Sequence, residues 1–293
     1  MLSFVQAVIS GLLMGGVYAV IAAGLSLIFG VMKIVNFAHG DFLMIFAYTS
    51  WVLVSRLGID PYLSMIIVLP VAFAVGYLFQ KILINGILKK EENVESPNIR
   101  LFTVGFAWFL SNLALLLFGA DIKTTQTRFK GLTIPLGEYV VSVPRLIAFV
   151  VSLAVTGIIF YILYRTETGR ALRAISQNRF TAELMGINVK KLYCIAFGLG
   201  LSVVGVSACL LVPFYSVFPT MGATFGLRSF VIVVLGGLGS IPGALAGGIA
   251  VGLMEAVGGQ FVSATSAEIM IFVVFLCALL IRSSDMFSRH KKA

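Results

Sequence analysis

The sequence is poor in charged residues. Only 11% of its 293 residues are Asp, Glu, Lys or Arg, whereas about 25% is usual in a soluble domain. Hydrophobic residues make up 59% of the chain. A water-facing globule is therefore excluded, and lipid must surround most of the chain.

Cysteine and histidine are also scarce. The three cysteines, Cys194, Cys209 and Cys277, lie in apolar runs without the paired spacing of metal or redox motifs, so we expect small buried side chains and no metal site. Of the two histidines, His290 lies in the C-terminal tail, and no Ser or Cys is paired with a base at a recognisable spacing. These absences argue against an enzyme, and no catalytic residue is expected.

Long apolar runs dominate the rest of the chain. A helix of about 20 apolar residues crosses a bilayer, and runs of this kind recur between short polar interruptions. They cover residues 4–24, 25–56, 61–86, 101–119, 143–164, 193–215, 227–257 and 265–282. The sequence therefore predicts an all-α polytopic membrane protein in which residues 1–293 form one transmembrane domain. About eight membrane elements are expected, and two of them, 25–56 and 227–257, are interrupted.

Basic residues predict the topology. The connection 165–192 is rich in Lys and Arg, so the positive-inside rule places it in the cytoplasm. The C-terminal tail, with Arg282, Arg289, Lys291 and Lys292, is expected on the same side. Counting spans back puts Lys89–Arg100 inside and Asp121–Glu138 in the periplasm. The formal charge of +9 then reflects topology and not nucleic-acid binding, because the basic residues form no patch interleaved with aromatics.

The element 227–257 contains the Gly-rich stretch Gly236–Gly243. Glycine weakens a helix, whereas Ser240 and Pro242 are residues that start one, so we expect a broken helix that re-enters the membrane. The functional interpretation is that Gly239, Ser240 and Pro242 line a solute path. A helix N-terminus offers N–H groups to a carboxylate there without an arginine at mid-span. The alternative is that these glycines only let two spans touch.

A second polar interruption lies at Val31–Phe42. Ionisable residues cost about 2.5–3.5 kcal/mol each at the centre of a membrane helix, so they need a local reason. One interpretation places Asn36, His39, Gly40 and Asp41 in the translocation pathway, where the polar side chains replace hydrogen bonds that a solute loses on leaving water. The alternative is a capped helix start with Asp41 in its first turn.

The two interruptions suggest a weak internal two-fold repeat. Sliding the chain by 203 positions lays His39–Phe42 over Pro242–Leu245, each between two apolar segments. If the repeat is real, the N-terminus is expected in the cytoplasm. If 4–30 and 41–57 are two complete spans, it is expected in the periplasm.

The cytoplasmic connection contains a short amphipathic pattern over 168–187. Apolar Leu172, Ile175 and Ala182 lie on one flank, and Gly186 stops the helix. A helix on the lipid or water surface and a helix that docks a cytoplasmic partner both fit this pattern.

Three segments resemble the branched-chain amino acid ABC permeases, in particular the shorter of their two membrane subunits: GLSLIFGVMKIVNFAHGDF (24–42), TGRALRAISQNRFTAELMGI (168–187) and VIVVLGGLGSIPGALAGG (231–248). The resemblance covers essentially the whole chain. It implies an importer of the bacterial inner membrane that carries leucine, isoleucine or valine. Its implied partners are a second homologous permease subunit, two ATP-binding cassette subunits and a periplasmic substrate-binding protein.

The resemblance also implies that 168–187 couples the permease to the ATPases. The coupling residues carried over are Thr168, Gly169, Arg170, Arg173, Ala174, Asn178, Ala182 and Gly186. The spacing from Ala182 to Gly186 is a degenerate form of the EAA-x-x-x-G pattern, because Phe180 and Thr181 replace its first two positions. No G-x-x-x-x-G-K-[ST] phosphate loop occurs, so ATP is expected on partner subunits and no cofactor on this chain.

Other transport functions stay open at this point. An ion-coupled secondary transporter also uses repeats and broken helices, and it would favour Asp41, Glu255 or Glu268 as ion sites. An importer of other amino acids, amides or urea fits the same resemblance. A purely structural membrane protein would leave the polar interruption at Val31–Phe42 unexplained.

Overall fold

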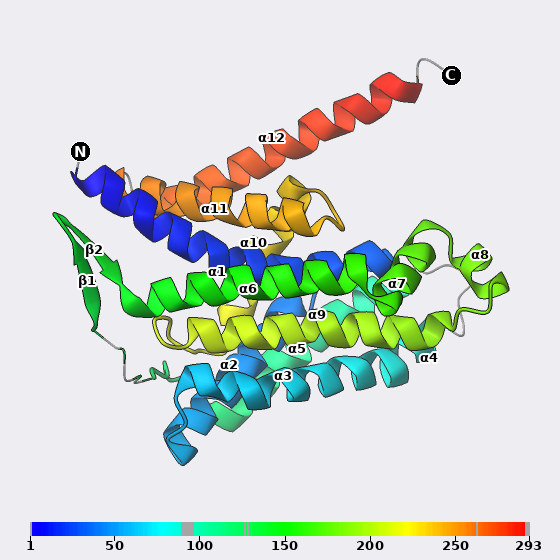
Figure 1. The fold of residues 1–293 in the computed structure, drawn as a ribbon, viewed down its shortest axis with the longest axis horizontal. Coiled ribbons are helices and arrows are strands. Elements are labelled where there is room, and N and C mark those ends of the chain that lie inside the picture. The colour runs from blue at the N-terminus through cyan, green and yellow to red at the C-terminus, as the bar shows by residue number, and fades with distance from the viewer. Residues whose placement is uncertain are drawn as a thin grey trace.

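The protein is a bundle of long, roughly parallel and antiparallel helices, with one small β-hairpin (Figure 1). The coordinates are a computed structural model, which describes residues 2–88, 97–125, 127, 129, 131–261 and 263–290. The helices are α1 (Leu2–Met32), α2 (His39–Leu57), α3 (Pro61–Leu78), the π-helix η1 (Phe79–Ile84), α4 (Asn85–Leu88), α5 (Pro97–Phe118), α6 (Val143–Arg165), α7 (Glu167–Gln177), α8 (Arg179–Leu184), α9 (Val189–Leu211), α10 (Met221–Gly236), α11 (Ile241–Phe261) and α12 (Ala264–His290). The strands are β1 (Thr133–Leu136) and β2 (Tyr139–Ser142).

Six helical stretches in the described residues are long and apolar enough to cross a membrane. They begin at Ser3, Pro61, Pro97, Val143, Val189 and Ile241. The shorter helix α10 and the apolar part of α12 accompany them. This arrangement confirms the predicted all-α polytopic membrane fold.

Helices α1 and α9 form the centre of the bundle. In their most apolar windows 83% and 89% of the residues are buried, against 17–28% in α3, α5 and α6. A helix that is apolar all round is buried on every side. The three outer helices instead turn large apolar side chains outward, which is the surface that lipid requires.

Glycine lets α1 and α11 pack closely in antiparallel directions. A Cβ on Gly11 would lie 2.7 Å from the carbonyl oxygen of Gly252, and a Cβ on Gly248 would lie 2.5 Å from the Cα of Ala19. Small residues that let helix backbones approach are typical of packing in membranes. Several of the 30 glycines of the chain therefore serve close helix packing on this face.

The first interruption differs from the predicted one in its start. The division between 4–24 and 25–56 is wrong, because α1 continues through Gly24 to Met32. Gly24 is used for packing, since a Cβ there would lie 2.7 Å from the carbonyl oxygen of Gly200 on α9. Residues 33–38 then return along α1, and α2 begins where His39 Nε2 lies 2.9 Å from the Ile21 carbonyl oxygen. Helix α2 therefore starts deep inside the bundle.

The second interruption is confirmed, and it makes a helical hairpin. Gly237 and Gly239 have φ of 94° and 86°, a region that favours glycine, so the chain turns tightly between α10 and α11. Gly247 of α11 packs back on Ile232 of α10. The turn lies beside the last residues of α1. A Cβ on Gly239 would lie 2.8 Å from the Cα of Gly30, close to the end of α1.

The helix boundaries follow the predicted repeat. A shift of 203 positions places Met32, His39, Leu57 and Pro61 within one residue of the corresponding ends and starts of α10, α11 and α12. The two halves differ in where the second helix starts. Residues 33–38 return into the bundle before α2 begins, whereas α11 begins directly after a tight turn at the end of α10. The side of the membrane on which the N-terminus lies stays a prediction.

The two ends of the bundle are distinct. The N-terminus lies at the end that carries the β-hairpin, where the Gln6 side chain donates to Val140 O over 2.7 Å and accepts from Val140 N over 3.0 Å. Helices α7 and α8 project from the opposite end (Figure 1). Residues 89–96 of the predicted loop Lys89–Arg100, together with Lys291 and Lys292, lie outside the described residues, as do the side chains of Arg282 and Arg289.

The α1–α11 contact predicts that Gly248→Leu destabilises the bundle. The added side chain meets the backbone of α1, which cannot move aside. The free energy of unfolding should therefore fall by at least about 1–3 kcal/mol, the usual cost of overpacking. Thermal unfolding of the detergent-purified protein measures the effect. Gly259→Leu is the matched control, since nothing lies within 4 Å of a Cβ at that position; equal stability of both variants would contradict this packing.

Candidate functional site

The starts of α2 and α10 meet in the middle of the bundle. Gly40, the second residue of α2, packs directly against the backbone of Gly222 and Gly226 in the first turns of α10. A side chain at position 40 would separate the two helices. The first N–H groups of a helix have no partner within the helix, and they carry partial positive charge. Two such ends therefore converge on one point.

A cavity of about 220 Å³ lies at this point. One part of its wall is polar and comes from the start of α2, with Asn36, His39 and Asp41. The other part is apolar and is formed by Leu25, Phe37, Ala223, Leu227 and Phe230. The structure thus brings together four of the residues predicted to line a translocation pathway, since Gly40 forms the helix crossing beside the cavity. We call this the α2/α10 cavity.

The polar side chains of the α2/α10 cavity are buried and only partly hydrogen-bonded. Asn36 is 2% and His39 1% exposed. Asn36 Oδ1 accepts from the Ala38 backbone N–H over 3.1 Å, and the Ser111 hydroxyl of α5 donates to Asp41 Oδ1 over 2.7 Å. Asn36 Nδ2 and His39 Nδ1 have no hydrogen-bond partner among the described residues. An unpaired buried polar atom costs about 1–3 kcal/mol, so a hydrogen-bond partner would stabilise each of these two atoms.

Asp41 also has the structural position that the helix-cap interpretation predicts. It lies in the first turn of α2, and a Cβ on Gly222 would lie 2.7 Å from Asp41 Oδ1. Its carboxylate therefore faces the positive ends of two helices, a stabilising position for an anion. The cap residue itself is Ala38, which contributes no side-chain hydrogen bond. The structural and functional interpretations of Asp41 are compatible with each other.

A second cavity, of about 460 Å³, lies next to the first, towards the β-hairpin end. Ser111, Asn112 and Thr220 give it a polar lining, and Ile122 and Phe218 are among its apolar residues. Ser111 belongs to this wall and donates to Asp41 in the wall of the α2/α10 cavity. The Ser111–Asp41 hydrogen bond therefore links the wall of one cavity to the wall of the other.

The second interruption lies elsewhere. Gly239 and Ile241 line a small cavity of about 80 Å³ with Leu172, Arg173 and Ser176 of α7. The Ser240 hydroxyl accepts from the Gly243 N–H over 3.1 Å and caps α11. The structure does not bring this turn to the α2/α10 cavity. A pathway role for Gly239, Ser240 and Pro242 stays a prediction.

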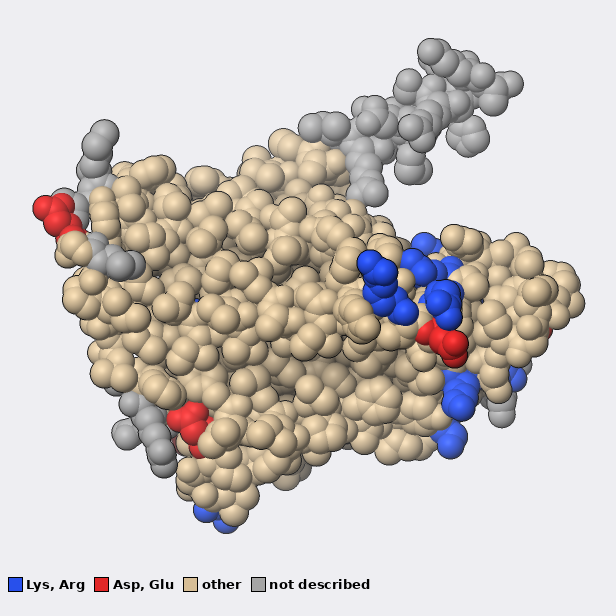
Figure 2. Space-filling model, viewed as in Figure 1, with Lys and Arg blue, Asp and Glu red and all other residues tan. Residues whose placement is uncertain are grey.

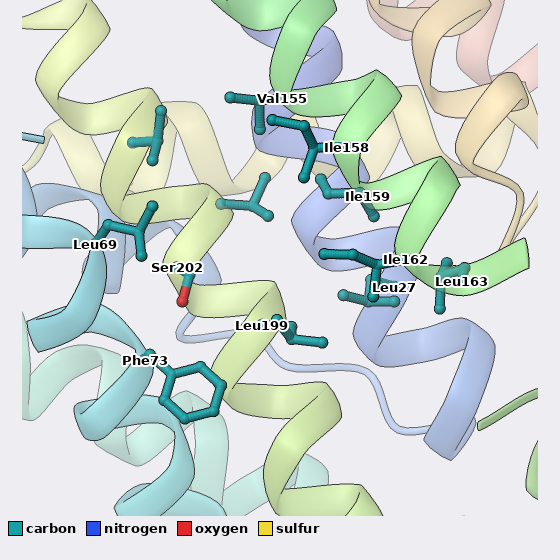
Figure 3. A pocket seen from close by; sticks show the side chains of 12 residues that line it. Leu27, Leu69, Phe73, Val155, Ile158, Ile159, Ile162, Leu163, Leu199 and Ser202 are labelled. Carbon is teal, nitrogen blue, oxygen red and sulfur yellow. The ribbon is translucent and has the colours of Figure 1, made fainter. Parts of the chain in front are cut away.

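A further cavity has an almost entirely apolar lining. A groove of about 210 Å³ lies between α1, α3, α6 and α9. Figure 3 shows its lining, with Leu69, Phe73, Ile158 and Leu199 among others. Its one hydroxyl, that of Ser202, already donates to Gly198 O over 2.9 Å. A polar solute would find no hydrogen-bond partner in this groove, whereas a lipid acyl chain needs none.

The predicted coupling segment forms the two short helices α7 and α8. Thr166 caps α7 by accepting from Gly169 N–H over 3.1 Å, and Asn178 caps α8 by accepting from Thr181 N–H over 3.0 Å. Gly169 packs on backbone carbonyls at the end of α6, so no side chain fits there. Gly186 has φ of 82°, as the predicted stop requires.

The remaining coupling residues lie around the two helices. Ala182 is buried, and Thr168, Arg173 and Ala174 are half-buried. Arg173 lies 5.0 Å from the ring centroid of Tyr164 at the end of α6. Arg170 is exposed and lies 3.5 Å from Glu167. Gly169 and Arg173 thus fix the start of the segment against the end of α6.

Sequence reasoning missed the exposed apolar tip of this segment. Phe180, Leu184 and Met185 are 70%, 72% and 79% exposed, on a part of the chain that projects beyond the bundle. Most of the Lys and Arg visible on the face in Figure 2 gather at this end, and the broad side of the bundle is free of charge. Exposed apolar patches with a polar rim are typical of interaction surfaces. The sequence signal for this tip was the presence of apolar residues on the side of the short helix opposite the buried Ala182.

Sequence reasoning missed an arginine that lies among the helices of the bundle. Arg228 of α10 donates to Tyr18 Oη over 2.6 Å and lies 3.0 Å from Glu255 of α11 and 2.9 Å from Glu268 of α12. We call these four residues the Arg228 cluster. Charged residues inside a membrane pair with one another, and this cluster ties four helices together on the face of α10 that turns away from the α2/α10 cavity.

The fold and the site define a class. Several membrane-spanning helices enclose a polar cavity at the crossing of two helix starts, and the two short helices α7 and α8 project from one end. These are the features of a multi-pass membrane transport protein.

The comparisons identify the family. A family profile described as "Branched-chain amino acid transport system / permease component" matches residues 7–280, and the chain belongs to this family. The chain is 28% identical over 302 residues to the high-affinity branched-chain amino acid permease LivH of Escherichia coli K12, covering 98% of this chain and 96% of that one. It is 29% identical over 300 residues to the permease BraD of Pseudomonas aeruginosa, with the same coverage. No solved structure gave a significant match.

The Arg228 cluster predicts a strong effect of Arg228→Ala. The change leaves Glu255 and Glu268 without their partner in a lipid-surrounded region, and breaking such a pair costs about 3–5 kcal/mol. We expect poor membrane insertion and a lower unfolding temperature. The triple variant R228M/E255Q/E268Q, which removes all three charges together, should recover most of the loss. Equal instability of both variants would show that the charges themselves do not matter.

Proposed function

We propose that the chain is the transmembrane permease subunit of an ATP-driven importer for branched-chain amino acids in the bacterial inner membrane. The observation that carries the proposal is a polar cavity, with two unpaired buried atoms, in the middle of helices that are otherwise apolar. The family supports the substrate class. Its relatives are named as branched-chain amino acid transport permeases.

Basic residues support the orientation. The α7–α8 end carries Arg170, Arg173 and Arg179, so we place it in the cytoplasm. The β-hairpin and the N-terminus then lie on the periplasmic side. Helix α12 runs antiparallel to α11, which favours a cytoplasmic C-terminus.

Each expected partner has a surface that suits it. The apolar tip of α8 suits one of two ATP-binding subunits, because the chain itself has no phosphate loop. The β-hairpin end suits a periplasmic binding protein that delivers the amino acid. Leu227 and Phe37 are about half-exposed at the mouth of the α2/α10 cavity, and a polar cavity cannot open onto lipid. A second permease subunit is therefore expected to cover this mouth, and lipid covers α3 and α6.

Two connections can carry motion from the ATPases to the cavity. Helices α6 and α9 continue directly from the ends of the coupling segment. The turn between α10 and α11 also lies against α7 at Arg173, and the other end of α10 crosses α2 at Gly40. Closure of the ATPases would push on α7 and tilt α6, α9 and the α10–α11 hairpin. The cavity would then open alternately to each side.

The main rival is an ion-coupled secondary transporter. Two of the three acids that it would use, Glu255 and Glu268, are paired with Arg228, which leaves Asp41 as the remaining candidate. Uptake of leucine into proteoliposomes that contain the whole complex separates the two functions. We expect uptake to require ATP inside the vesicles and to survive a protonophore at constant ATP. Collapse with the protonophore would favour the rival. Identifying the ligand of the periplasmic binding protein tests which solute is carried, including the alternatives of other amino acids, amides or urea.

The coupling assignment predicts the effect of changes at the cytoplasmic end. Gly186→Leu forces a side chain into a left-handed backbone conformation, and Arg173→Glu reverses the charge beside Tyr164. Phe180→Asp and Leu184→Asp make the apolar tip polar. We expect all four variants to insert normally and to lose most substrate-stimulated ATPase activity, at least tenfold. Glu167→Gln is the matched surface control. Normal stimulation in the four variants would remove the coupling role.

The two interruptions predict different reactivity towards a water-soluble thiol reagent. Asn36→Cys and His39→Cys should react and be protected by substrate or by trapping the ATP-bound state, because both positions line the α2/α10 cavity. Ser240→Cys tests whether the second turn also lines the path. Protection by substrate would support that prediction. An inert thiol at position 240 would leave the turn with a packing and coupling role only.

A further inference from the structure

The hydrogen-bonding groups of the α2/α10 cavity have a definite polarity. His39 Nε2 lies 2.9 Å from the Ile21 carbonyl oxygen, and a carbonyl only accepts, so Nε2 must carry the proton. In a neutral imidazole the other nitrogen is then an acceptor. His39 Nδ1, which has no partner among the described residues, therefore offers a lone pair.

Asp41 adds a second acceptor to the same wall. Its Oδ1 receives one hydrogen bond from Ser111, and an ionised carboxylate can accept about four. Within the part of the chain that the structure describes, Asp41 forms no salt bridge. Asp41 and His39 Nδ1 together suit a cationic donor such as an ammonium group.

Asn36 presents the opposite polarity. Its Oδ1 is already used by the Ala38 N–H, so the amide group that remains is Nδ2, a donor without a described partner. A donor in a buried position suits a carboxylate. The cavity thus holds acceptors at His39 and Asp41 and a donor at Asn36.

The rest of the wall suits an apolar side chain. Phe37 and Phe230 stack with their ring centroids 6.0 Å apart, and Leu25 and Leu227 also line the cavity. A zwitterionic amino acid with a branched side chain has the three matching parts, an ammonium, a carboxylate and an apolar group.

We propose that the α2/α10 cavity binds the amino acid in one orientation during transit. The ammonium group binds Asp41 and His39 Nδ1, the carboxylate binds Asn36 Nδ2, and the side chain packs on Phe37, Leu227 and Phe230. This assignment rests on the proposed transport function. It makes the permease itself selective for the charge pattern of the solute, in addition to any selection by a binding protein. An uncharged amide would leave Asp41 without a cation.

Three probes of similar shape separate the two charges. L-Leucine carries both, 3-methylbutylamine carries only the ammonium group, and 4-methylpentanoate carries only the carboxylate. The reporter is Leu227→Cys in a Cys277→Ser background of the complete transporter, since Cys194 and Cys209 are buried and Cys277 is exposed. The measurement is the rate of labelling by a water-soluble maleimide as a function of probe concentration. Met185→Cys at the exposed tip is the control, and no probe should protect it.

Two isosteric changes test the polarity. Asp41→Asn should weaken protection by leucine and by the amine about ten- to a hundredfold, which is the loss expected for a charge-assisted hydrogen bond. Protection by the acid should not weaken. Asn36→Asp keeps the acceptor for Ala38 and replaces the donor with an oxygen. It should weaken protection by the acid and by leucine, and strengthen protection by the amine.

The opposite pattern overturns the assignment. If Asp41→Asn affects the amine and the acid equally, or affects neither, the ammonium group does not bind Asp41. Copurification with the ATP-binding subunits verifies that each variant folds. Where Asp41→Asn fails this check, Asp41→Glu is used in its place. In that variant the amine must still protect the reporter thiol better than the acid does. ATP-driven uptake is measured in the same preparation. Uptake without the predicted polarity rejects only this inference, and absence of uptake in the unmodified transporter rejects the proposed function.

Discussion

The crossing of Gly40 with Gly222 and Gly226 is the constraint on which the rest of the structure depends. Two helices can start inside a lipid-surrounded bundle only if their free N–H groups are kept away from hydrocarbon. Here α2 and α10 start against each other and away from lipid, with the Asp41 carboxylate between them. The chain must therefore return from the end of α1 into the bundle, and α10 must be short. The polar cavity is a direct result of this geometry, because helix starts and the residues that precede them replace continuous helix.

Much of the fold could be predicted from the sequence because lipid imposes a simple rule on it. Apolar runs of about 20 residues become helices, and the glycines and Ser240 and Pro242 correctly mark the turn between α10 and α11. The N-terminal boundary could not be predicted. Gly24 looked like a place for a division, and its actual use, packing on Gly200, depends on a helix about 175 positions further along the chain.

The site was predictable in part, for a related reason. Asn36, His39 and Asp41 stand out because polar residues are rare in such a sequence, and the structure places them together. Nothing local in the sequence shows that Asp41 meets Ser111 or that the α10–α11 turn lies beside α7, since both depend on tertiary packing. Arg228 was hidden within an apolar run. Its two acidic partners, Glu255 and Glu268, drew attention separately as ion sites, although they neutralise one arginine.

The long-range contacts of α1 have a consequence for biogenesis. Helix α1 is the first to leave the ribosome, yet its principal neighbours, α9 and α11, come near the end of the chain. Its glycine-lined face, with Gly11 and Gly15, must wait in the bilayer without a native partner while more than half of the protein is made. Helix α10 adds to the delay, because Arg228 finds its counter-charges only when α11 and α12 have been inserted. The packing of α1 is thus completed late, and in a chain that ends before α11 the glycines Gly11 and Gly15 lack the helix on which they pack.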